Sequence, residues 1–390
     1  MVQKLSFSVF AVVLLTLMSL GCYYLSRRII WVFPNLKTKK KYIYFTFVLF
    51  IAVQALGPIM YRISTFGNEK QFIIQWIAYV SLGFIASLFF YLLAAEALTF
   101  ILKKIARLNK TNNNFESLER RLFLGVGLFS FTTAAIGTKT ALDGPQIEIV
   151  DIPIKNLPEE FLGFKIAQIS DLHIGPTIDK NYAKNVVDLT LSFNPDLIVL
   201  TGDMIDGYPE QLRPHLEPLQ SLKAPHGVYY CTGNHEYYWG VDQWCEEFRT
   251  MGFNVLLNES RMITKGTSQI CIGGVTDHRA ETFSEAHKPD AIKTFSGVPK
   301  EIIKILMAHQ PAAYQQSLDA GVHLQLSGHT HGGQFFPWSI FVAISHKFYR
   351  GLYFYKDLWV YTNRGTGYWG PPQRFSVPSE ITQIRLTRGV

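Results

Sequence analysis

The chain of 390 residues contains few cysteines, and it lacks internal repeats and low-complexity stretches. Its four cysteines are too few for a disulfide framework. Cys245 and Cys271 could pair if this part of the chain were exported, but no spacing requires it. Neither zinc-finger spacing nor a separate basic recognition helix occurs in the C-terminal part. These absences disfavour a disulfide-rich scaffold, a solenoid and a nucleic-acid-binding protein.

Acidic residues are scarce in the first third, where residues 1–141 contain 16 lysines and arginines but four aspartates and glutamates. The remainder contains 21 basic and 26 acidic residues. The overall net charge of +7 therefore divides into +12 before residue 142 and −5 after it. The basic excess belongs to the N-terminal third and does not indicate a nucleic-acid-binding surface, so we expect no nucleic-acid partner.

Long apolar stretches fill the same third, at roughly 5–25, 42–61, 72–102 and 122–138. A membrane-spanning helix needs ~20 mostly apolar residues, and each stretch approaches or meets that length. We therefore predict a transmembrane region of about four helices over 1–141, followed by a second domain over 142–390. Two alternatives are buried helices of a soluble domain and, for the fourth stretch, an amphiphilic linker. We interpret residues 1–22 as a signal anchor, since further apolar stretches follow.

The charges between these stretches predict an orientation. The loops at 26–41 and 103–121 each contain six basic residues, whereas the loop between the second and third stretches carries only Arg62, Glu69 and Lys70. Under the positive-inside rule the two basic loops are cytoplasmic. With four spans, the C-terminal domain of this multi-pass cell-membrane protein lies outside the cytoplasm. The orientation reverses if the fourth stretch does not cross.

Five short polar motifs in the C-terminal domain each follow an apolar, strand-like run. The runs cover residues 164–170, 196–201, 227–232, 302–308 and 322–327 and are rich in β-branched and aromatic residues. In open α/β sheets, ligands bind beyond the carboxyl ends of the strands, so the motifs are expected to converge. Asp, His and Asn together suit divalent cations, and the pattern predicts a two-metal centre. The motifs are Asp171-Leu-His173, Gly202-Asp203, Gly233-Asn234-His235-Glu236, His309 and Gly328-His329-Thr-His331.

This ordered set resembles the calcineurin-like metallophosphoesterase family. The resemblance covers Ile166 to Leu386, and further segments resemble its membrane-associated bacterial branch. It implies an α/β fold, a four-layer α/β/β/α sandwich around a dinuclear centre that hydrolyses phosphate esters. These further segments are Ala308-His309-Gln310-Pro311, Ser327-Gly328-His329-Thr330-His331-Gly332-Gly333-Gln334, Arg364-Gly365-Thr366-Gly367 and Pro371-Pro372.

The resemblance also implies roles for single residues. His235 is similar to a family residue near the leaving-group oxygen, where an imidazolium can donate a proton; the alternative is a hydrogen-bonding partner without a catalytic role. The cofactors implied are two divalent ions, and mixed His, Asp and Asn ligands suit Mn, Fe, Zn or Ni. The implied ligands are Asp171, His173 and His331 for the first ion, Asn234, His309 and His329 for the second, and Asp203 as the bridge.

Two nearby acids and the other histidines receive simpler interpretations. Glu236 orients a ligand or caps the next helix, and we favour the cap. Asp206 is interpreted as a loop or cap residue. Five histidines outside the motifs are interpreted as surface or packing residues, namely His226, His278, His287, His323 and His346.

Aromatic residues are concentrated after the last motif, beginning with Phe335-Phe336-Pro337-Trp338. Exposed aromatics beside a metal centre suit a bilayer interface or a lipid tail, whereas the alternative is ordinary packing. The sequence therefore predicts a membrane-anchored phosphoesterase that acts with a metal-activated water on a phosphomonoester, phosphodiester or pyrophosphate. A lipid-linked substrate and contact with the bilayer are expected. The alternative function is a non-catalytic membrane scaffold or binding protein that uses the same fold.

Overall fold

The computed structural model describes residues 2–63, 69–108 and 115–389. The chain forms two compact units, each described by itself below. The helical unit contains Met1–Lys139 together with Gly370–Phe375, and the α/β unit contains Thr140–Trp369 and Ser376–Val390.

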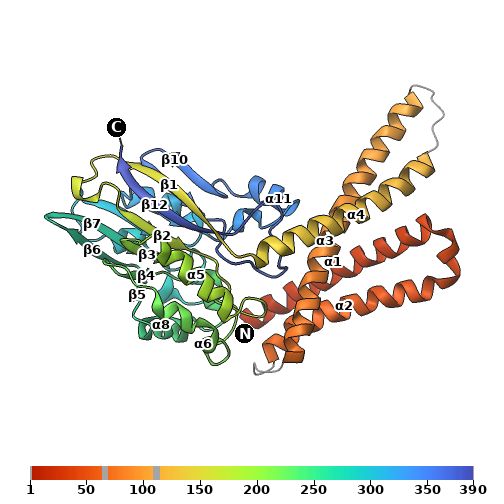
Figure 1. The fold of residues 1–390 in the computed structure, drawn as a ribbon, viewed down its shortest axis with the longest axis horizontal. Helices are drawn as coiled ribbons and strands as arrows, with labels where there is room; N and C mark the ends of the chain where they lie inside the picture. Colours follow the sequence, from red (N-terminus) through yellow and green to blue (C-terminus); the bar gives the residue numbers. More distant parts are fainter. Residues whose placement is uncertain (1, 64–68, 109–114, 390) are drawn as a thin grey trace. The chain divides into compact units, whose positions relative to one another are not determined.

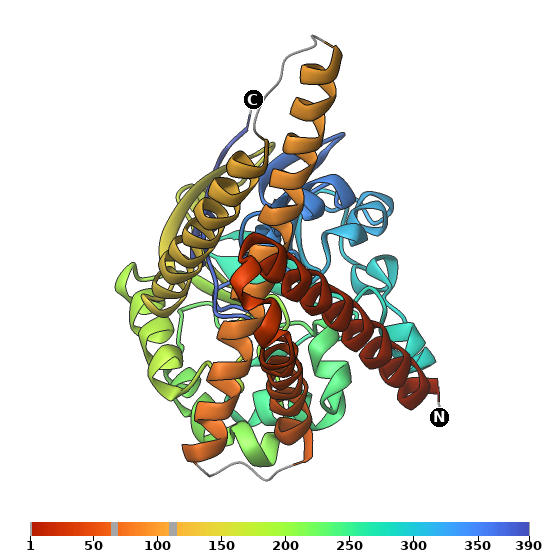
Figure 2. The same ribbon diagram turned by 90° about the vertical axis from the view of Figure 1, so that its right-hand side faces the viewer.

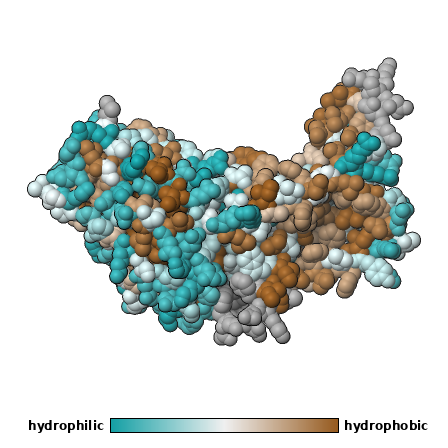
Figure 3. All heavy atoms as spheres, viewed as in Figure 1, coloured by the Kyte–Doolittle hydropathy of each residue, from teal (hydrophilic) through white to brown (hydrophobic). Residues whose placement is uncertain are grey.

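The helical unit is built from long helices with apolar sequences (Figures 1 and 2). Large apolar side chains such as Phe100 and Leu128 are exposed, and Figure 3 shows hydrophobic residues over much of the visible face of this unit. Apolar surface of this kind is stable in lipid rather than in water. The helices are α1 (Val2–Val32), α2 (Lys40–Ile63), α3 (Glu69–Leu108) and α4 (Phe115–Leu142), with the 3-10 helix η1 (Pro34–Lys39) before α2.

Two helices in the described part of the chain are long and apolar enough to cross a membrane, over Ile73–Leu108 and Phe115–Leu142. They correspond to the third and fourth predicted stretches, and α4 is a continuous helix rather than a linker. The first two stretches, 5–25 and 42–61, lie in α1 and α2. Several of their side chains fall outside the described residues, so four crossings remain a prediction. Much of the predicted loop at 103–121 is helical, because α3 continues to Leu108 and α4 starts at Phe115.

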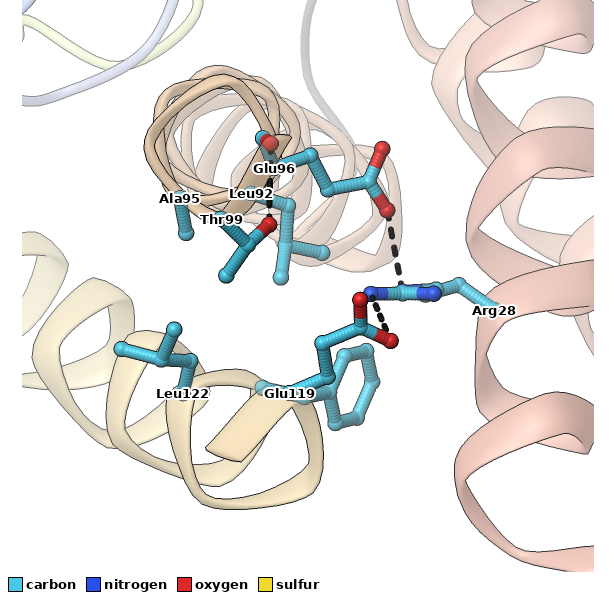
Figure 4. Close-up of a pocket in the computed structure, with 8 residues that line it drawn as sticks. Arg28, Leu92, Ala95, Glu96, Thr99, Glu119 and Leu122 are labelled. Carbon is cyan, nitrogen blue, oxygen red and sulfur yellow. Dashed lines mark hydrogen bonds and ion pairs between the residues drawn. The ribbon is translucent and has the colours of Figure 1, made fainter. Parts of the chain in front are cut away.

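A cluster of charged side chains joins three helices of this unit (Figure 4). Arg28 of α1 lies between Glu96 of α3 and Glu119 of α4, with Arg28 Nε 2.9 Å from Glu96 Oε1 and Arg28 Nη2 3.8 Å from Glu119 Oε2. Lys103 of α3 also pairs with Glu119. The side chain of Glu119 is 9% exposed, so its charge depends on these two cations for compensation.

The segment Gly370–Phe375 packs against α3 and α4, although it comes from the C-terminal part of the sequence. The Arg374 side chain is fully buried, and its backbone N–H donates to the Gly137 carbonyl at 2.9 Å. A Cβ at Gly83 would lie 2.6 Å from Gln373 Nε2, so α3 needs a glycine where the segment passes. A fragment that starts at residue 142 would remove these partners, and functional tests therefore require the full chain.

Two six-stranded sheets form the α/β unit. The first has the order β1-β12-β2-β3-β4-β5, with β2, β3 and β4 mutually parallel. Its strands are β1 (Gln146–Ile154), β2 (Lys165–Ile169), β3 (Leu197–Leu200), β4 (Val228–Tyr230), β5 (Asn254–Val255) and β12 (Glu380–Arg388).

The second sheet has the order β10-β11-β9-β8-β7-β6, with β7, β8 and β9 mutually parallel. All five strand-like runs predicted before the motifs contain strands, namely β2, β3 and β4 in the first sheet and β8 and β9 in the second. The strands of this sheet are β6 (Glu259–Lys265), β7 (Ser268–Gly274), β8 (Ile303–Met307), β9 (Leu324–Ser327), β10 (Gly351–Tyr355) and β11 (Leu358–Thr362).

The main hydrophobic core lies between the two sheets, where buried residues of both pack together, including Ile166 and Val199 against Ile305 and Leu326. Helices α5 and α8 contact the first sheet, and α9 and α10 contact the second. The mixed α/β sheets expected from the sequence are thus present. The helices are α5 (Lys180–Ser192), α6 (Pro209–Leu216), α7 (Asn234–Tyr238), α8 (Val241–Thr250), α9 (Ala291–Thr294), α10 (Tyr314–Asp319) and α11 (Trp338–Ser345), with 3-10 helices η2 (Glu159–Phe161), η3 (Glu217–Ser221), η4 (Ala280–Thr282), η5 (Glu285–His287), η6 (Pro311–Ala313) and η7 (His331–Gly333).

The charged cluster leads to a prediction about the thermal stability of the helical unit. Glu119→Gln keeps the side-chain size but removes the carboxylate that pairs with Lys103, while Arg28 retains Glu96. Because a hydrogen bond to a charged group contributes about 1.5–3 kcal/mol, we expect a lower thermal midpoint of helix unfolding in detergent, measured by circular dichroism. Glu116→Gln is the matched control, since that side chain is 65% exposed one turn earlier. Equal midpoints for the two variants would contradict a stabilising role.

Candidate metal centre

All five predicted motifs lie just beyond the carboxyl ends of parallel strands. Asp171 and His173 follow β2, Asp203 follows β3, and Asn234 opens α7 after β4. His309 follows β8, and the last motif follows β9. The two sheets therefore contribute to one site, as expected for ligand binding at this edge of an α/β sheet.

Three of the predicted ligands form a first cluster. Ligand atoms of Asp171, His173 and His331 all lie within 4.8 Å of one another. The Nε2 atoms of His173 and His331 are 3.0 Å apart, and His331 Nε2 lies 3.5 Å from Asp171 Oδ1. All three residues are buried. Two ring nitrogens and a carboxylate that face one another at these distances can hold a cation between them.

A second cluster contains Asp203, His309 and His329, again with ligand atoms within 4.8 Å. His309 Nε2 lies 3.1 Å from Asp203 Oδ2 and 3.2 Å from the side-chain oxygen Oδ1 of Asn234. Asp203 Oδ2 also lies 4.0 Å from His173 Nε2. The structure therefore brings all seven predicted ligand residues together, with Asp203 between the two clusters.

The charge balance of these residues fits a bound cation. Asp171 and Asp203 are at most 2% exposed, and within the described chain their ion pairs all go to histidine. Burial raises the pKa of Asp171. Burial disfavours the charged form of His309, but the effect of the Asp203 carboxylate is larger than that of burial. The pKa of His309 is therefore raised well above its ordinary value. Buried carboxylates without lysine or arginine partners require positive charge, which divalent cations supply.

Neighbouring groups orient the ring nitrogens. His309 Nδ1 lies 2.8 Å from the Thr201 carbonyl oxygen and donates to it, so Nε2 is the ring nitrogen that faces the site. Burial, followed by the charge of His309, lowers the pKa of His329 to about 3. A histidine that stays neutral at physiological pH retains a lone pair for a metal.

The backbone at the site is strained. Five of the seven predicted ligand residues have left-handed φ angles between 51° and 70°. Non-glycine residues adopt this conformation rarely, and such strain is concentrated at functional sites. Glycine is required at position 328, where a Cβ would lie 2.1 Å from Asp171 Oδ2. The five residues are Asp171, His173, Asp203, His329 and His331.

His235 faces the second cluster from α7. Its backbone N–H donates to Asp203 Oδ1 at 2.8 Å, and its Nε2 lies 3.8 Å from Asp203 Oδ2. Burial disfavours the charged ring, but the carboxylates of Asp206 and Asp203 outweigh burial and raise the pKa of His235 to about 9. The Trp369 ring lies edge-on to the His235 ring at 5.4 Å. These two carboxylates therefore favour the protonated form of the His235 ring.

Asp206 has a larger role than the loop or cap residue that we predicted. It is mostly buried, and its carboxylate pairs with Nδ1 of both His173 and His235. One residue thus orients a candidate ligand and the candidate proton donor. The three-residue spacing from Asp203 was visible in the sequence, but the approach of both rings depends on the tertiary structure.

Glu236 does cap α7, accepting from the Gly233 N–H at 2.7 Å, but the preferred interpretation of it as a simple cap was incomplete. The same fully buried carboxylate accepts from the backbone N–H groups of Asp203 at 3.1 Å and Met204 at 2.8 Å. Glu236 therefore fixes the loop that carries the shared Asp203.

The remaining histidines stay outside the candidate metal clusters found in the described residues. His287 Nδ1 pairs with the Tyr237 hydroxyl at 2.9 Å, and His323 Nδ1 accepts from the Lys304 backbone N–H at 3.1 Å. The His346 ring lies 6.3 Å from the His329 ring. The four cysteines are buried and unpaired, so Cys245 and Cys271 form no disulfide.

Comparisons with known proteins agree with this arrangement. A family model described as calcineurin-like phosphoesterase matches residues 164–333. A transmembrane protein with a metallophosphoesterase domain from Danio rerio is 33% identical, over 80% of this chain and 74% of the relative. An uncharacterized metallophosphoesterase of Helicobacter pylori is 31% identical, over 93% of this chain and 94% of the relative. A putative metallophosphoesterase of Caenorhabditis elegans is 34% identical, over 80% of this chain and 68% of the relative.

The hydrogen bonds of Glu236 generate a prediction about metal affinity. Glu236→Gln replaces one acceptor oxygen with an NH₂ group that faces backbone N–H donors, so the Asp203 loop loses its fixed position. We expect the affinity for Mn²⁺ to fall roughly 10- to 100-fold, measured by calorimetric titration of the full-length protein. Glu246→Gln is the control, because that side chain is 71% exposed. Unchanged affinity in Glu236→Gln would show that this carboxylate does not support the site.

Proposed function

The chain belongs to the calcineurin-like metallophosphoesterase family, and we propose that it is a membrane-anchored hydrolase of phosphate esters or pyrophosphates that uses two divalent metal ions. The observation that carries this proposal is that Asp203 belongs to two candidate ligand groups, one with His309 and His329 and one with His173 and His235, beside the group of Asp171, His173 and His331. A family member that had lost catalysis would not be expected to retain every ligand and the strained backbone that presents them.

We assign seven residues to the two ions. The donor set of imidazole, carboxylate and amide groups fits Mn, Fe, Zn or Ni, and cellular supply decides among them. The neutral Asn234 completes a site without adding negative charge. Asp171, His173 and His331 would hold the first ion, Asn234, His309 and His329 the second, and Asp203 both.

When bound, the two ions polarise a phosphoryl group and lower the pKa of a water toward neutrality. The protein supplies orientation and a proton. His235, protonated because of Asp206 and Asp203, is placed to donate to the leaving-group oxygen. Asp206 holds the His235 ring through Nδ1, which leaves Nε2 directed toward the Asp203 side of the site.

The proposal of a membrane anchor is supported by α3 and α4, which are both long and apolar enough to cross a bilayer. The Danio rerio relative is itself named a transmembrane protein. We propose four crossings by α1 to α4. With the basic ends of α1 and α3 in the cytoplasm, this arrangement places the α/β unit outside the cytoplasm.

The alternative function, a non-catalytic scaffold, is separated from the enzyme by Asp203→Asn. Asparagine tolerates the left-handed backbone at this position, so the fold is retained while the shared carboxylate is lost. We expect the full-length protein in nanodiscs with Mn²⁺ to hydrolyse at least one of an aryl phosphomonoester, an aryl phosphodiester and a nucleotide-sugar pyrophosphate. In Asp203→Asn that rate should fall at least about 100-fold. A metal-loaded protein that is inactive on all three would favour the scaffold.

The position of Asp206 yields a second kinetic prediction. Asp206→Asn removes the charge that keeps His235 protonated and oriented, so kcat should fall about 100-fold while KM stays nearly constant. Steady-state kinetics on the best substrate of the panel provide the measurement. Asp188→Asn, with a side chain 59% exposed on α5, serves as the control. A change in KM alone would contradict the assigned role.

A further inference from the structure

Helix α11 has no buried residue, and its residues are apolar except for Ser339 and Ser345. Ile344 is 80% exposed, and Trp338, Ile340 and Phe341 are 47–49% exposed. We call these four side chains the α11 surface. A surface helix that faces water normally carries a polar face, so the α11 surface is suited to an apolar environment. Of the predicted Phe335–Trp338 segment, Trp338 is exposed and the two phenylalanines are half-buried.

The charges around α11 indicate what kind of apolar environment this is. Residues 331–356 contain no aspartate or glutamate, whereas Lys347, Arg350 and Lys356 follow the helix within this range. Lys347 and Arg350 are exposed. An apolar helix flanked by basic residues is the pattern of a helix that lies in the headgroup region of an anionic bilayer.

The helix is firmly joined to the candidate metal centre. His331 begins η7, and α11 packs directly against η7. At Gly333 a Cβ would lie 2.2 Å from the Ser339 Cα, so the backbones of the turn and the helix are in contact. Next to this turn, the Gln334 side chain binds both the N–H and the carbonyl of Trp369 at 2.9 Å. Any surface that α11 contacts is therefore close to the site.

A bilayer is within reach of the α/β unit through the chain itself. The candidate spanning helix α4 ends at Leu142, and β1 starts at Gln146. The three residues between them extend over about 10 Å. The matched family region ends at residue 333, before α11 starts at Trp338. The α11 surface thus lies outside that region.

We propose that the α11 surface inserts into the headgroup layer of an anionic bilayer and that the enzyme cleaves a phosphate ester carried by a lipid. The part of this inference that concerns the substrate rests on the proposed function. Insertion of α11 places the centre beside the membrane surface, where a lipid-borne phosphate reaches it without leaving the bilayer.

Depth measurements test the insertion without relying on activity. A nitroxide is attached at Ile344→Cys in the full-length protein, in nanodiscs of anionic lipid; the native cysteines are buried. Ile292→Cys is the control, because it is 64% exposed on α9, which packs against β6 and β7. We expect the label at 344 to collide more with oxygen and less with a water-soluble nickel chelate than the label at 292 does. Equal accessibility at the two positions would overturn the insertion.

Kinetics in the same nanodiscs test the substrate. In the double variant Phe341→Ser, Ile344→Ser, kcat/KM for a lipid phosphomonoester should fall roughly tenfold, as apolar area no longer anchors the helix, while hydrolysis of a soluble aryl phosphate is unchanged. Equal loss of activity on both substrates, or loss on neither, overturns the proposal.

If the wild-type protein cleaves the aryl ester but not the lipid, the lipid substrate is overturned and the proposed hydrolase stands. If neither is cleaved while label 344 is inserted, the lipid phosphomonoester substrate is overturned and the bilayer contact stands, and the hydrolase also fails if the phosphodiester and the pyrophosphate are not cleaved.

Discussion

The compensation of buried negative charge is the constraint on which the site depends. Asp171 and Asp203 lie almost without solvent exposure where the strands of two sheets end, and no lysine or arginine of the described chain pairs with them. Charge in such a place is stable only when paired. Histidines surround the two carboxylates, and their ring nitrogens are directed at the same space. This arrangement suits bound cations rather than a fixed salt bridge. The positive charge that the carboxylates induce on His309 marks where such charge is needed.

Holding these groups together requires local strain and a supporting layer of polar groups. Left-handed backbone at five ligand residues costs energy that the surrounding sheets must offset. Glu236 contributes by binding three backbone N–H groups around Asp203, and Thr201 and Asp206 orient the rings of His309 and His173. The rigidity of the site thus comes from the two-sheet core, and its chemistry from loops at the edge of that core.

Much of this site could be predicted from the sequence because each ligand directly follows a buried strand. Runs such as Leu197–Leu200 specify β3, and the position of Asp203 follows from the end of that strand. The contributions of Asp206 and Glu236 could not be predicted, since their partners are far apart in the sequence and meet only in the folded chain. The same holds for Gly370–Phe375, whose association with α3 and α4 depends on the absence of side chains at Gly83 and Gly137. The hydrophobic pattern of the sequence did not distinguish the exposed helix α11 from a segment of the core, because both consist mainly of apolar residues.

The most direct test of the central claim is electron paramagnetic resonance of the full-length protein loaded with Mn²⁺. If two ions share Asp203, they lie close enough for their electron spins to couple, so we expect an exchange-coupled spectrum that is replaced by the signal of isolated ions in Asp203→Asn. A spectrum of isolated Mn²⁺ in the saturated wild-type protein would contradict the shared two-metal centre.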